Sequence, residues 1–259
     1  MTEQMARARR LVGEANRIVV LTGAGISAES GVPTFRGAGG LWKSHRSEEI
    51  ATPEAFARDP QTVWEWYSWR RGLIADCAPN RGHMALARLA LAGTPTTIVT
   101  QNVDGLHTRA AHEAGGGGDP SPALPVEIHG AIDRDKCSAC GVRTPGTTSV
   151  DASSHASLPR CTGCNGMLRP DAVWFGEALE PEVLSHVFGA AQDADLCLVV
   201  GTSALVQPAA SVPLVTQHSG GMLIEVNLEP TPLSGEAEVS LLGPAGELLP
   251  ELLDVEPPT

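Results

Sequence analysis

The sequence predicts an α/β fold with a parallel sheet and, separately, a cysteine motif of the kind that binds a metal. Three observations carry this prediction. Short β-branched apolar runs alternate with segments of helical periodicity, as in parallel sheets whose strands are joined by crossover helices. A glycine-rich turn follows the first apolar run, and two C-x-x-C pairs occur further along the 259-residue chain. Because ligands bind such sheets at the carboxyl ends of the strands, we expect the functional site there.

The elements of this fold can be assigned in chain order. Strands are expected at 18–22, 96–100, 196–200 and 223–226. Helices are expected at 5–16, 64–76, 82–91, 181–192, 208–218 and 246–253. Asn80 is a candidate cap for the helix that begins at 82. The polar segment before Pro60 has no predicted element.

The turn after the first strand has the sequence Gly23-Ala24-Gly25-Ile26-Ser27-Ala28. It fits the G-x-G-x-x-G/A pattern, in which the glycines permit a tight turn and the close approach of a pyrophosphate. Alone, the pattern fits a simple tight connection equally well. Polar residues also follow the strands at 96–100, 196–200 and 223–226. Their gathering at one sheet edge is hard to explain by stability alone and favours a binding site.

Composition argues against several classes of partner. The formal net charge is −12, whereas binding to nucleic acid or anionic membranes needs clustered Lys and Arg. No apolar run reaches the roughly 18 residues of a membrane span, and the N-terminal segment lacks the apolar core of a signal peptide. We therefore expect a cytoplasmic protein without nucleic-acid or membrane partners. The sequence leaves the oligomeric state open, with a monomer expected.

Four of the six cysteines form two C-x-x-C pairs, Cys137 with Cys140 and Cys161 with Cys164. Their separation of roughly 20 residues is typical of a tetrathiolate zinc site. Two redox pairs are the alternative. Four thiolates complete the coordination of a tetrahedral ion, so we expect one structural zinc and not a Lewis acid catalyst. His155, between the pairs, is expected to be solvated.

Together these motifs resemble those of the sirtuins, which are NAD-dependent protein lysine deacylases. The resemblance covers almost the whole chain, and the order of the motifs makes it specific. They are Gly23-Ala-Gly-Ile-Ser27, Gly31-Val-Pro-Thr-Phe-Arg36, Thr100-Gln-Asn-Val-Asp104, His129-Gly130, the two C-x-x-C pairs, Val173-Trp-Phe-Gly176, Gly201-Thr-Ser203 and Asn227-Leu-Glu229.

The resemblance implies a division of the chain and a reaction. Residues 1–38, 81–130 and 169–259 would form a Rossmann-like NAD-binding domain. A helical insertion, 39–80, and a zinc ribbon, 131–168, would form the smaller domain. NAD and an acylated-lysine protein would meet between the two domains. NAD would be consumed, and the products would be nicotinamide, 2′-O-acyl-ADP-ribose and free lysine.

The resemblance also implies roles for single residues. His129 would be the catalytic general base that acts on a ribose hydroxyl, for which an imidazole with a near-neutral pKa is suited. Val173, Trp174 and Phe175 would pair with an extended substrate peptide. The residues expected to contact NAD are Gly23, Ala24, Gly25, Ile26, Glu29, Thr34, Phe35, Arg36, Trp42, Gln101, Asn102, Asp104, Gly201, Thr202, Ser203, Asn227, Leu228, Glu229 and Ala245.

Two further features resemble the sirtuin branch that removes negatively charged acyl groups such as succinyl and malonyl. They are Tyr67-Ser-Trp-Arg70 and the glycine-rich sequence 37–42. Positions i and i+3 share a helix face, so the phenol and the guanidinium could reach one carboxylate. An ordinary aromatic–Arg helix face is the simpler interpretation of the spacing alone.

Other interpretations of these residues stay open at the level of sequence. Phe35 could pack in the core, Asn102 and Asp104 could cap the following helix, and 173–175 could be a core strand. His107 is expected to buttress the loop at 101–104. The competing functions are a plain deacetylase, a mono-ADP-ribosyltransferase, a non-catalytic NAD sensor and a zinc-ribbon nucleic-acid binder; the acidic composition counts against the last.

Overall fold

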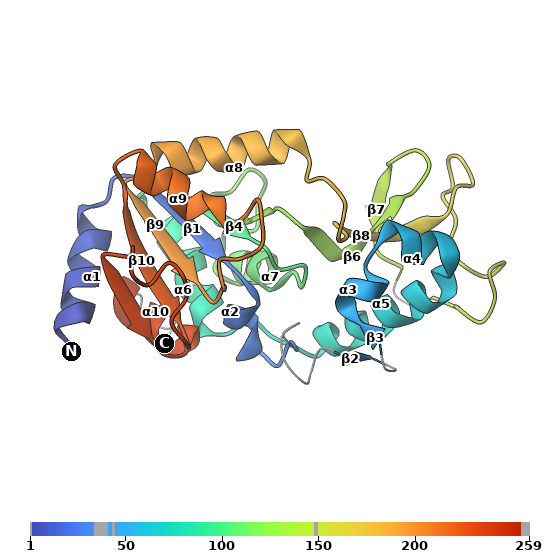
Figure 1. Ribbon diagram of the computed structural model, residues 1–259, viewed down its shortest axis with the longest axis horizontal. Helices are drawn as coiled ribbons and strands as arrows, with labels where there is room; N and C mark the ends of the chain where they lie inside the picture. The colour runs from blue at the N-terminus through green and yellow to red at the C-terminus, as the bar shows by residue number, and fades with distance from the viewer. Residues whose placement is uncertain (1, 34–40, 43–44, 148–149, 255–259) are drawn as a thin grey trace.

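The structure is a computed structural model that describes residues 2–33, 41–42, 45–147 and 150–254. Figure 1 shows two parts side by side along the long axis of the molecule. The larger part contains both ends of the described chain and a sheet covered by helices. The smaller part is formed by two separate excursions of the chain. None of the described helices is long and apolar enough to span a membrane.

Six strands form the sheet of the larger part, in the order β5-β4-β1-β9-β10-β11. All five pairings are parallel. This is the order 3-2-1-4-5-6 of a dinucleotide-binding sheet, and it reverses direction between β1 and β9. The strands are β1 Ile18–Thr22, β4 Thr96–Thr100, β5 Val126–Glu127, β9 Leu196–Val200, β10 Met222–Asn227 and β11 Val239–Leu242.

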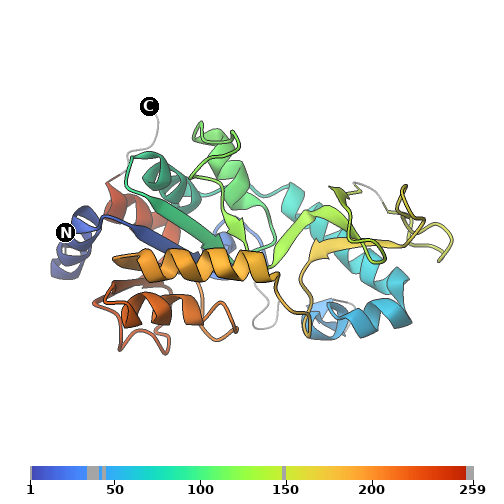
Figure 2. The ribbon, with the colours of Figure 1, turned by 90° about the horizontal axis from the view of Figure 1, so that it is seen from above.

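Helices cover both faces of this sheet (Figure 2). One face packs against α1 Glu3–Glu14, α6 Arg81–Leu91, α7 Leu106–Glu113 and α10 Ala245–Leu253, and the other against α8 Pro181–Asp193 and α9 Ser211–His218. The side chains of β1 alternate between the two cores: Ile18 and Val20 enter the first, whereas Val19 and Leu21 enter the second. A strand buried on both faces reads as a continuous apolar run, which is why the sequence identified it.

The smaller part contains a three-stranded antiparallel sheet, β7-β6-β8, and several helices. Its own core gathers Trp64, Trp66 and Tyr67 of α5 with Trp174 and two of the zinc-motif cysteines. The elements are β2 Leu41–Trp42, β3 His45–Arg46, α3 Ser47–Ile50, α4 Pro53–Arg58, α5 Pro60–Ala75, β6 Gly130–Cys137, β7 Arg143–Pro145 and β8 Leu168–Ala172.

The predicted fold class is confirmed, and the strands at 96–100 and 196–200 have the predicted bounds. Three differences are informative. Helices α3 and α4 lie in the segment that had no predicted element, although Thr52 caps α4 and Pro53 occupies its first turn, both usual start signals. Helix α9 begins at Ser211, not 208. Strand β8 pairs with β6, so 169–172 lie in the smaller sheet and not in the larger part to which they were assigned.

Candidate functional site

The turn after β1 and the turn after β9 touch through their backbones. Gly25 donates its N–H to the Gly201 carbonyl (2.7 Å), and Gly23 donates to the Val200 carbonyl (3.0 Å). A Cβ on Gly25 would lie 2.7 Å from the Gly201 Cα. Gly201 itself has φ +58°, which favours glycine. These glycines are therefore required for contact between the two turns, in addition to the ligand approach that the pattern predicts.

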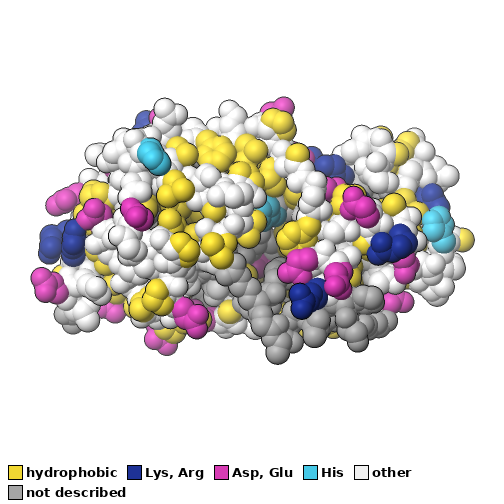
Figure 3. Space-filling view, in the orientation of Figure 1, with side chains coloured by type: hydrophobic (Ala, Val, Ile, Leu, Met, Phe, Trp, Pro, Cys, Tyr) yellow, Lys and Arg dark blue, Asp and Glu magenta, His cyan; other side chains and the backbone are white. Residues whose placement is uncertain are grey.

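A hollow opens beside the two turns, at the carboxyl ends of β9 and β10. Its lining residues are Gly25, Gly201, Val226, Asn227, Leu228, Gly243 and Ala245. All but Val226 and Gly243 are residues predicted to contact NAD. Figure 3 shows that the described surface is also recessed between the two parts of the molecule. The structure thus brings together, at one sheet edge, predicted residues that come from four segments of the sequence.

The amides that follow β4 bind to these turns. Gln101 Nε2 donates to Thr202 Oγ1 (2.9 Å), and Asn102 Nδ2 donates to the Gly23 carbonyl (3.0 Å) and to Ser27 Oγ (3.1 Å). Asn102 is buried, at 8% exposure. Its amide joins the loop after β4 to the turn after β1, which differs from the helix-cap role considered for it.

Asp104, by contrast, does bind the start of a helix, one residue before the cap residue Gly105. Its Oδ1 accepts the N–H of Leu106 (2.9 Å), the first residue of α7. Burial raises the pKa of Asp104, and the Leu106 N–H, Ser27 and the cations Arg70 and Arg109 oppose that rise. Arg70 belongs to α5 of the smaller part, so the Asp104 carboxylate of the larger part interacts electrostatically with a cation of the smaller part.

His129 lies in the short link between β5 and β6, which joins the two sheets. Its Nδ1 is 2.9 Å from the Gln101 carbonyl oxygen; because a carbonyl only accepts, Nδ1 carries the hydrogen and Nε2 keeps its lone pair. Burial lowers the pKa of His129, against the smaller opposite effect of that carbonyl. At neutral pH the imidazole can therefore accept a proton through Nε2. The next residue, Gly130, has φ +74°, and a Cβ there would lie 2.0 Å from the Asp171 carbonyl oxygen.

Two more histidines are buried beneath the glycine turn. His107 Nε2 lies 3.0 Å from Thr22 Oγ1, and His83 Nε2 lies 3.3 Å from Ser27 Oγ. Burial lowers the pKa of His107 to about 4 and that of His83 well below its usual value, so both are neutral. His107 supports the end of β1, next to the loop it was expected to buttress. His83 was not predicted from the sequence, although the capping residue Asn80 was, and the Asn80 N–H bonds to the His83 ring.

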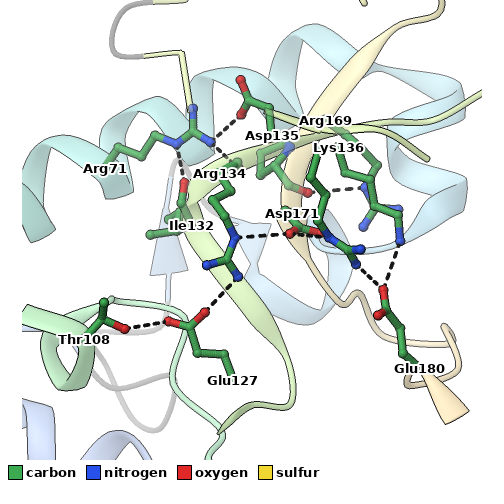
Figure 4. Close-up of polar contacts among 12 residues, drawn as sticks. Arg71, Thr108, Glu127, Ile132, Arg134, Asp135, Lys136, Arg169, Asp171 and Glu180 are labelled. Carbon is green, nitrogen blue, oxygen red and sulfur yellow. Dashed lines mark hydrogen bonds and ion pairs between the residues drawn. The ribbon is translucent and has the colours of Figure 1, made fainter. Parts of the chain in front are cut away.

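A chain of ion pairs joins the two sheets beside the β5–β6 link (Figure 4). Arg134 of β6 binds Glu127 of β5 (2.8 Å) and Asp171 of β8 (3.4 Å). Arg143 of β7 binds Asp171 (2.8 Å) and also Glu180, which precedes α8. Burial raises the pKa of Glu127, and Arg134 opposes this rise. Of these pairs, only the Arg134–Glu127 pair bridges the link itself, and its carboxylate is 13% exposed, whereas Arg143 and Glu180 are 44% and 42% exposed, so their pair contributes little.

Helix α5 carries the two residues predicted to recognise the acyl group. Tyr67 is 2% exposed, and its hydroxyl accepts a hydrogen bond from Trp174 Nε1 (2.9 Å). The Arg70 guanidinium lies 4.9 Å from the centroid of the Trp66 ring and 5.9 Å from that of Tyr67. Burial lowers the pKa of Arg70, while Tyr67 and Asp104 raise it. Tyr67 and Arg70 of α5 therefore lie in one cluster with Trp174, which is 107 residues from Tyr67 in the sequence.

The segment 173–175 is not a strand, because β8 ends at Ala172. The interpretation of these residues as a core strand is wrong: Trp174 is buried, but Phe175 is 50% exposed. Their backbone N–H groups donate, at 2.8–2.9 Å, to the His129 carbonyl, the Glu177 carboxylate and the Ala51 carbonyl in that order. Pairing with a substrate peptide stays a prediction, and it would use the carbonyl groups of this segment.

Several predicted NAD contacts lie elsewhere. Thr34, Phe35 and Arg36 fall outside the described residues, and only the backbone of Trp42 is described, in β2. The Ile26 side chain is fully buried in the core, so only its backbone can meet a ligand. Glu29 accepts the N–H of Gly246 (3.0 Å) and so fixes the start of α10. Of the rest, Ala24 and Ser203 are half-buried, and Glu229 is exposed beside Leu228.

The four cysteines of the C-x-x-C pairs form one cluster. Their Sγ atoms lie within 4.8 Å of one another, with Cys137–Cys164 at 3.5 Å and Cys140–Cys161 at 3.8 Å. A tetrahedral zinc ion with Zn–S bonds of about 2.3 Å requires S···S distances of about 3.8 Å. The residues therefore fit one zinc ion, and the close contacts between the pairs disfavour two separate redox pairs. His155 is exposed and is not part of the cluster.

The backbone prepares one of these thiols for a metal. The N–H groups of Cys140 and Ala139 point at the Cys137 sulfur (3.5 and 3.4 Å). They lower the pKa of Cys137 to about 6, with the Cys140 N–H having the largest effect. A thiolate, the form that binds zinc, is thereby favoured at neutral pH.

The strand order, the interlocked glycine turns and the cysteine cluster define a dinucleotide-binding α/β protein with a zinc module. A model of the Sir2 family matches residues 23–208. The chain is 44% identical over 247 residues to an NAD-dependent protein deacylase of Pyrococcus furiosus, covering 95% of each chain. It is 46% identical over 259 residues to one of Thermus thermophilus, covering 98% of this chain and 96% of that one.

Solved structures agree with these sequence matches. A Sir2 homologue in complex with NAD has a TM-score of 0.85 at 43% identity and covers 96% of this chain and 92% of its own. A Sir2–p53 peptide–NAD⁺ complex has a TM-score of 0.83 at 31% identity, covering 98% of each chain. The chain belongs to the Sir2 family, as the order of its motifs implied.

Proposed function

We propose that this chain, an NAD-dependent protein-lysine deacylase of the Sir2 family, prefers acyl groups that end in a carboxylate, such as succinyl or malonyl. The observation that carries the proposal is the hydrogen bond from Trp174 Nε1 to the Tyr67 hydroxyl (2.9 Å). It sets the helix face of Tyr67 and Arg70 against the segment expected to bind the substrate. The protein substrate is supported by the similar Sir2–p53 peptide complex.

The Tyr67 hydroxyl is suited to donate to a carboxylate. The bond from Trp174 occupies a lone pair of the phenol oxygen and leaves its hydrogen for another acceptor. Burial raises the pKa of Tyr67, so the phenol stays protonated at neutral pH. Arg70 follows at i+3 on the same helix face. Its planar fork can bind both carboxylate oxygens while the phenol binds one of them.

The electrostatic surroundings also favour a charged acyl group over acetyl. Burial makes the Arg70 cation costly, which is the cause of its lowered pKa. A carboxylate brought to the guanidinium offsets that cost, whereas a methyl group cannot. Hydrogen bonds to charged groups are worth about 1.5–3 kcal/mol, so we expect a preference of roughly 10- to 100-fold.

On the NAD side, His129 acts as the general base. Its Nδ1–H is held by the Gln101 carbonyl (2.9 Å), so Nε2 is the atom that accepts a proton from a ribose hydroxyl. NAD supplies the ribose carbon from which nicotinamide leaves. Gly25, Gly201, Asn227 and Ala245, around the hollow at the sheet edge, bind the rest of the dinucleotide. The cysteine cluster holds one structural zinc ion.

The test is nicotinamide release from NAD with one peptide carrying acetyl-, succinyl-, malonyl- or glutaryl-lysine, with the products identified by mass spectrometry. We expect kcat/KM to be highest for the acyl groups that end in a carboxylate. Tyr67→Phe and Arg70→Met should each lower the succinyl/acetyl ratio about 10-fold or more. Arg70→Lys keeps the charge without the fork and is the matched control, with an intermediate ratio expected.

His129→Ala should abolish release with every peptide. A wild-type enzyme that prefers acetyl-lysine would make the chain a plain deacetylase. Transfer of ADP-ribose to the peptide would make it a mono-ADP-ribosyltransferase. An unchanged ratio in Tyr67→Phe and Arg70→Met would remove the acyl-carboxylate assignment even if deacylation itself is confirmed.

A further inference from the structure

We infer that Arg71 is the positioning residue that sets helix α5 against the strand leaving His129. Arg71 directly follows Arg70 and lies at i+4 from Tyr67, so it shares a helix face with the phenol. It is expected to touch neither substrate nor NAD. The inference rests on the proposed function for the identity of the acyl-binding side chains.

The partner of Arg71 is a bulge in β6. Ala131 of β6 lies opposite Asp171 of β8, and Asp135 lies opposite Pro170. The three residues 132–134 therefore have no counterpart on β8, although consecutive residues of β8 pair on either side of them. Bulges of this kind redirect a strand and leave backbone groups without their ladder partners. Backbone carbonyl groups that lose their ladder partners in this way need hydrogen-bond donors from other parts of the chain.

Arg71 supplies these donors (Figure 4). Its Nε donates to the Ile132 carbonyl (2.6 Å), and its Nη2 donates to the Arg134 carbonyl (3.1 Å). The same guanidinium binds the Asp135 carboxylate (2.6 Å) and the Thr147 carbonyl (2.9 Å). Asp135 is fully buried and Arg71 is 12% exposed. Only a guanidinium has separate donors at fixed angles for four acceptors; an ammonium cannot reproduce them.

The bulge is connected to the NAD side of the site. The Ile132 N–H donates to the Val103 carbonyl (2.8 Å), inside the loop that carries Gln101, Asn102 and Asp104. Strand β6 begins at Gly130, the residue after His129. The Arg71 guanidinium thus binds the β6 backbone a few residues after His129. The Arg71 backbone belongs to α5, the helix that carries Tyr67 and Arg70.

A second contact on the same helix supports this arrangement. Trp64 Nε1 donates to the Leu168 carbonyl of β8 (3.1 Å), and the Arg71 guanidinium lies 5.4 Å from the Trp64 ring centroid. Side chains of helix α5 therefore bind the backbone of both strands of the β6–β8 pair. If the Arg71 fork is lost, α5 can shift while the amides of the loop after β4 keep their bonds to the glycine turn. Binding of the acyl peptide should then suffer more than binding of NAD.

The experiment compares Arg71→Lys with Arg143→Lys in the full-length, zinc-loaded enzyme. Arg143 is also in the smaller part, and its described contacts are to Asp171 and Glu180. We measure kcat and KM for acetyl- and succinyl-lysine peptides at saturating NAD, the KM for NAD, the zinc content and Tm. Arg71→Lys should raise the succinyl-peptide KM about 10-fold or more and the acetyl-peptide KM less, with the NAD KM within twofold of wild type. Arg143→Lys should leave all three constants within twofold.

The inference would be overturned if Arg71→Lys had the same kinetic constants as wild type. It would also be overturned if Arg71→Lys and Arg143→Lys changed these constants equally. If Arg71→Lys does not fold, Arg71→Met combined with Asp135→Asn removes both buried charges and leaves neither unpaired. The double variant should show the same rise in peptide KM; a fall in Tm with unchanged KM would also overturn the inference. Failure of the proposed acyl preference appears separately, as equal kcat/KM for both peptides in wild type, and the acetyl-peptide KM still tests Arg71 in that case.

Discussion

The two sides of the candidate site are held in place by different physical means. On the sheet side, amides and hydroxyls bind the backbone of neighbouring turns, as Asn102 does with Gly23 and Asn227 does with Thr202. On the other side, α5 is held by aromatic side chains and by the buried pair of Arg71 and Asp135. The first side inherits its geometry from the register of parallel strands. The second side depends on single side chains and on the cysteine cluster that fits one zinc ion. Its geometry should therefore be easier to change by single substitutions.

Removal of zinc should separate the two sides most strongly. Binding of structural zinc contributes on the order of 10–16 kcal/mol, comparable to the whole stability of a domain. Chelation, or Cys161→Ser, should therefore unfold the three-stranded sheet and abolish deacylation. NAD binding measured by calorimetry should persist within about tenfold, because β1, β4, β9 and β10 pair with one another. Re-addition of zinc to the chelated enzyme is the control, and parallel loss of NAD binding would show that the two sides are not separable.

Acid should disturb the sheet side through His107. Its pKa is about 4 in the folded chain, against 6.5 for the ordinary side chain. Between these values the unfolded chain binds the proton first, so the contribution of this group to stability is present above pH 6.5 and is lost as the pH falls to 4. The expected loss is about 3 kcal/mol in the free energy of unfolding.

Urea titrations between pH 7.5 and 4.5 measure this effect. His107→Gln keeps an amide donor towards Thr22 but does not titrate, so its stability should change less over the same range. His186→Gln, on the exposed surface of α8, should behave like wild type. A wild-type profile as flat as that of His107→Gln would contradict the prediction.

Two glycines give the smallest and most direct contrast. Gly25→Ala should cost about 1–3 kcal/mol by overpacking, because its Cβ would lie 2.7 Å from both the Cα and the carbonyl oxygen of Gly201. A Cβ at Gly72, in α5, would meet no atom within 4 Å. Gly72→Ala should therefore raise the free energy of unfolding by about 0.5–1 kcal/mol through helix propensity. Thermal unfolding should show shifts of opposite sign, about 2–4 °C per kcal/mol. Equal shifts would mean that the interlocked turns have room that the backbone positions do not show.

The sheet side was largely predictable from the sequence, and the other side only in part. Strands buried on both faces leave continuous apolar runs, and the polar residues that end them converge because parallel strands share an edge. The cysteine spacing likewise implied the cluster. The bond between Trp174 and Tyr67, and the pairing of Arg71 with Asp135, join residues far apart in the chain. Buried polar pairs of this kind leave no periodic pattern in the sequence, so they cannot be predicted from it.

The same limit applies to the groups beneath the glycine turn. Ser27 and His83 are buried polar residues whose partners come from different elements. The tight turn at Gly23 and Gly25 was predicted for a ligand, but the contact with Gly201 could only be seen once β1 and β9 were side by side. In each case the missing information was which segments are neighbours in space.

The strand order has a consequence for the growing polypeptide. The central strand β1 pairs with β9, Ile18 lying opposite Leu196, and both excursions into the smaller part lie between them. Such long-range pairing slows folding, because the closure entropy comes before the contacts that offset it. The hollow predicted to receive the dinucleotide is lined by Val226, Asn227, Leu228, Gly243 and Ala245, among others. The ribosome must therefore release residue 245 before these residues can assemble, and the apolar run of β1 has no β9 partner until residues 196–200 have emerged.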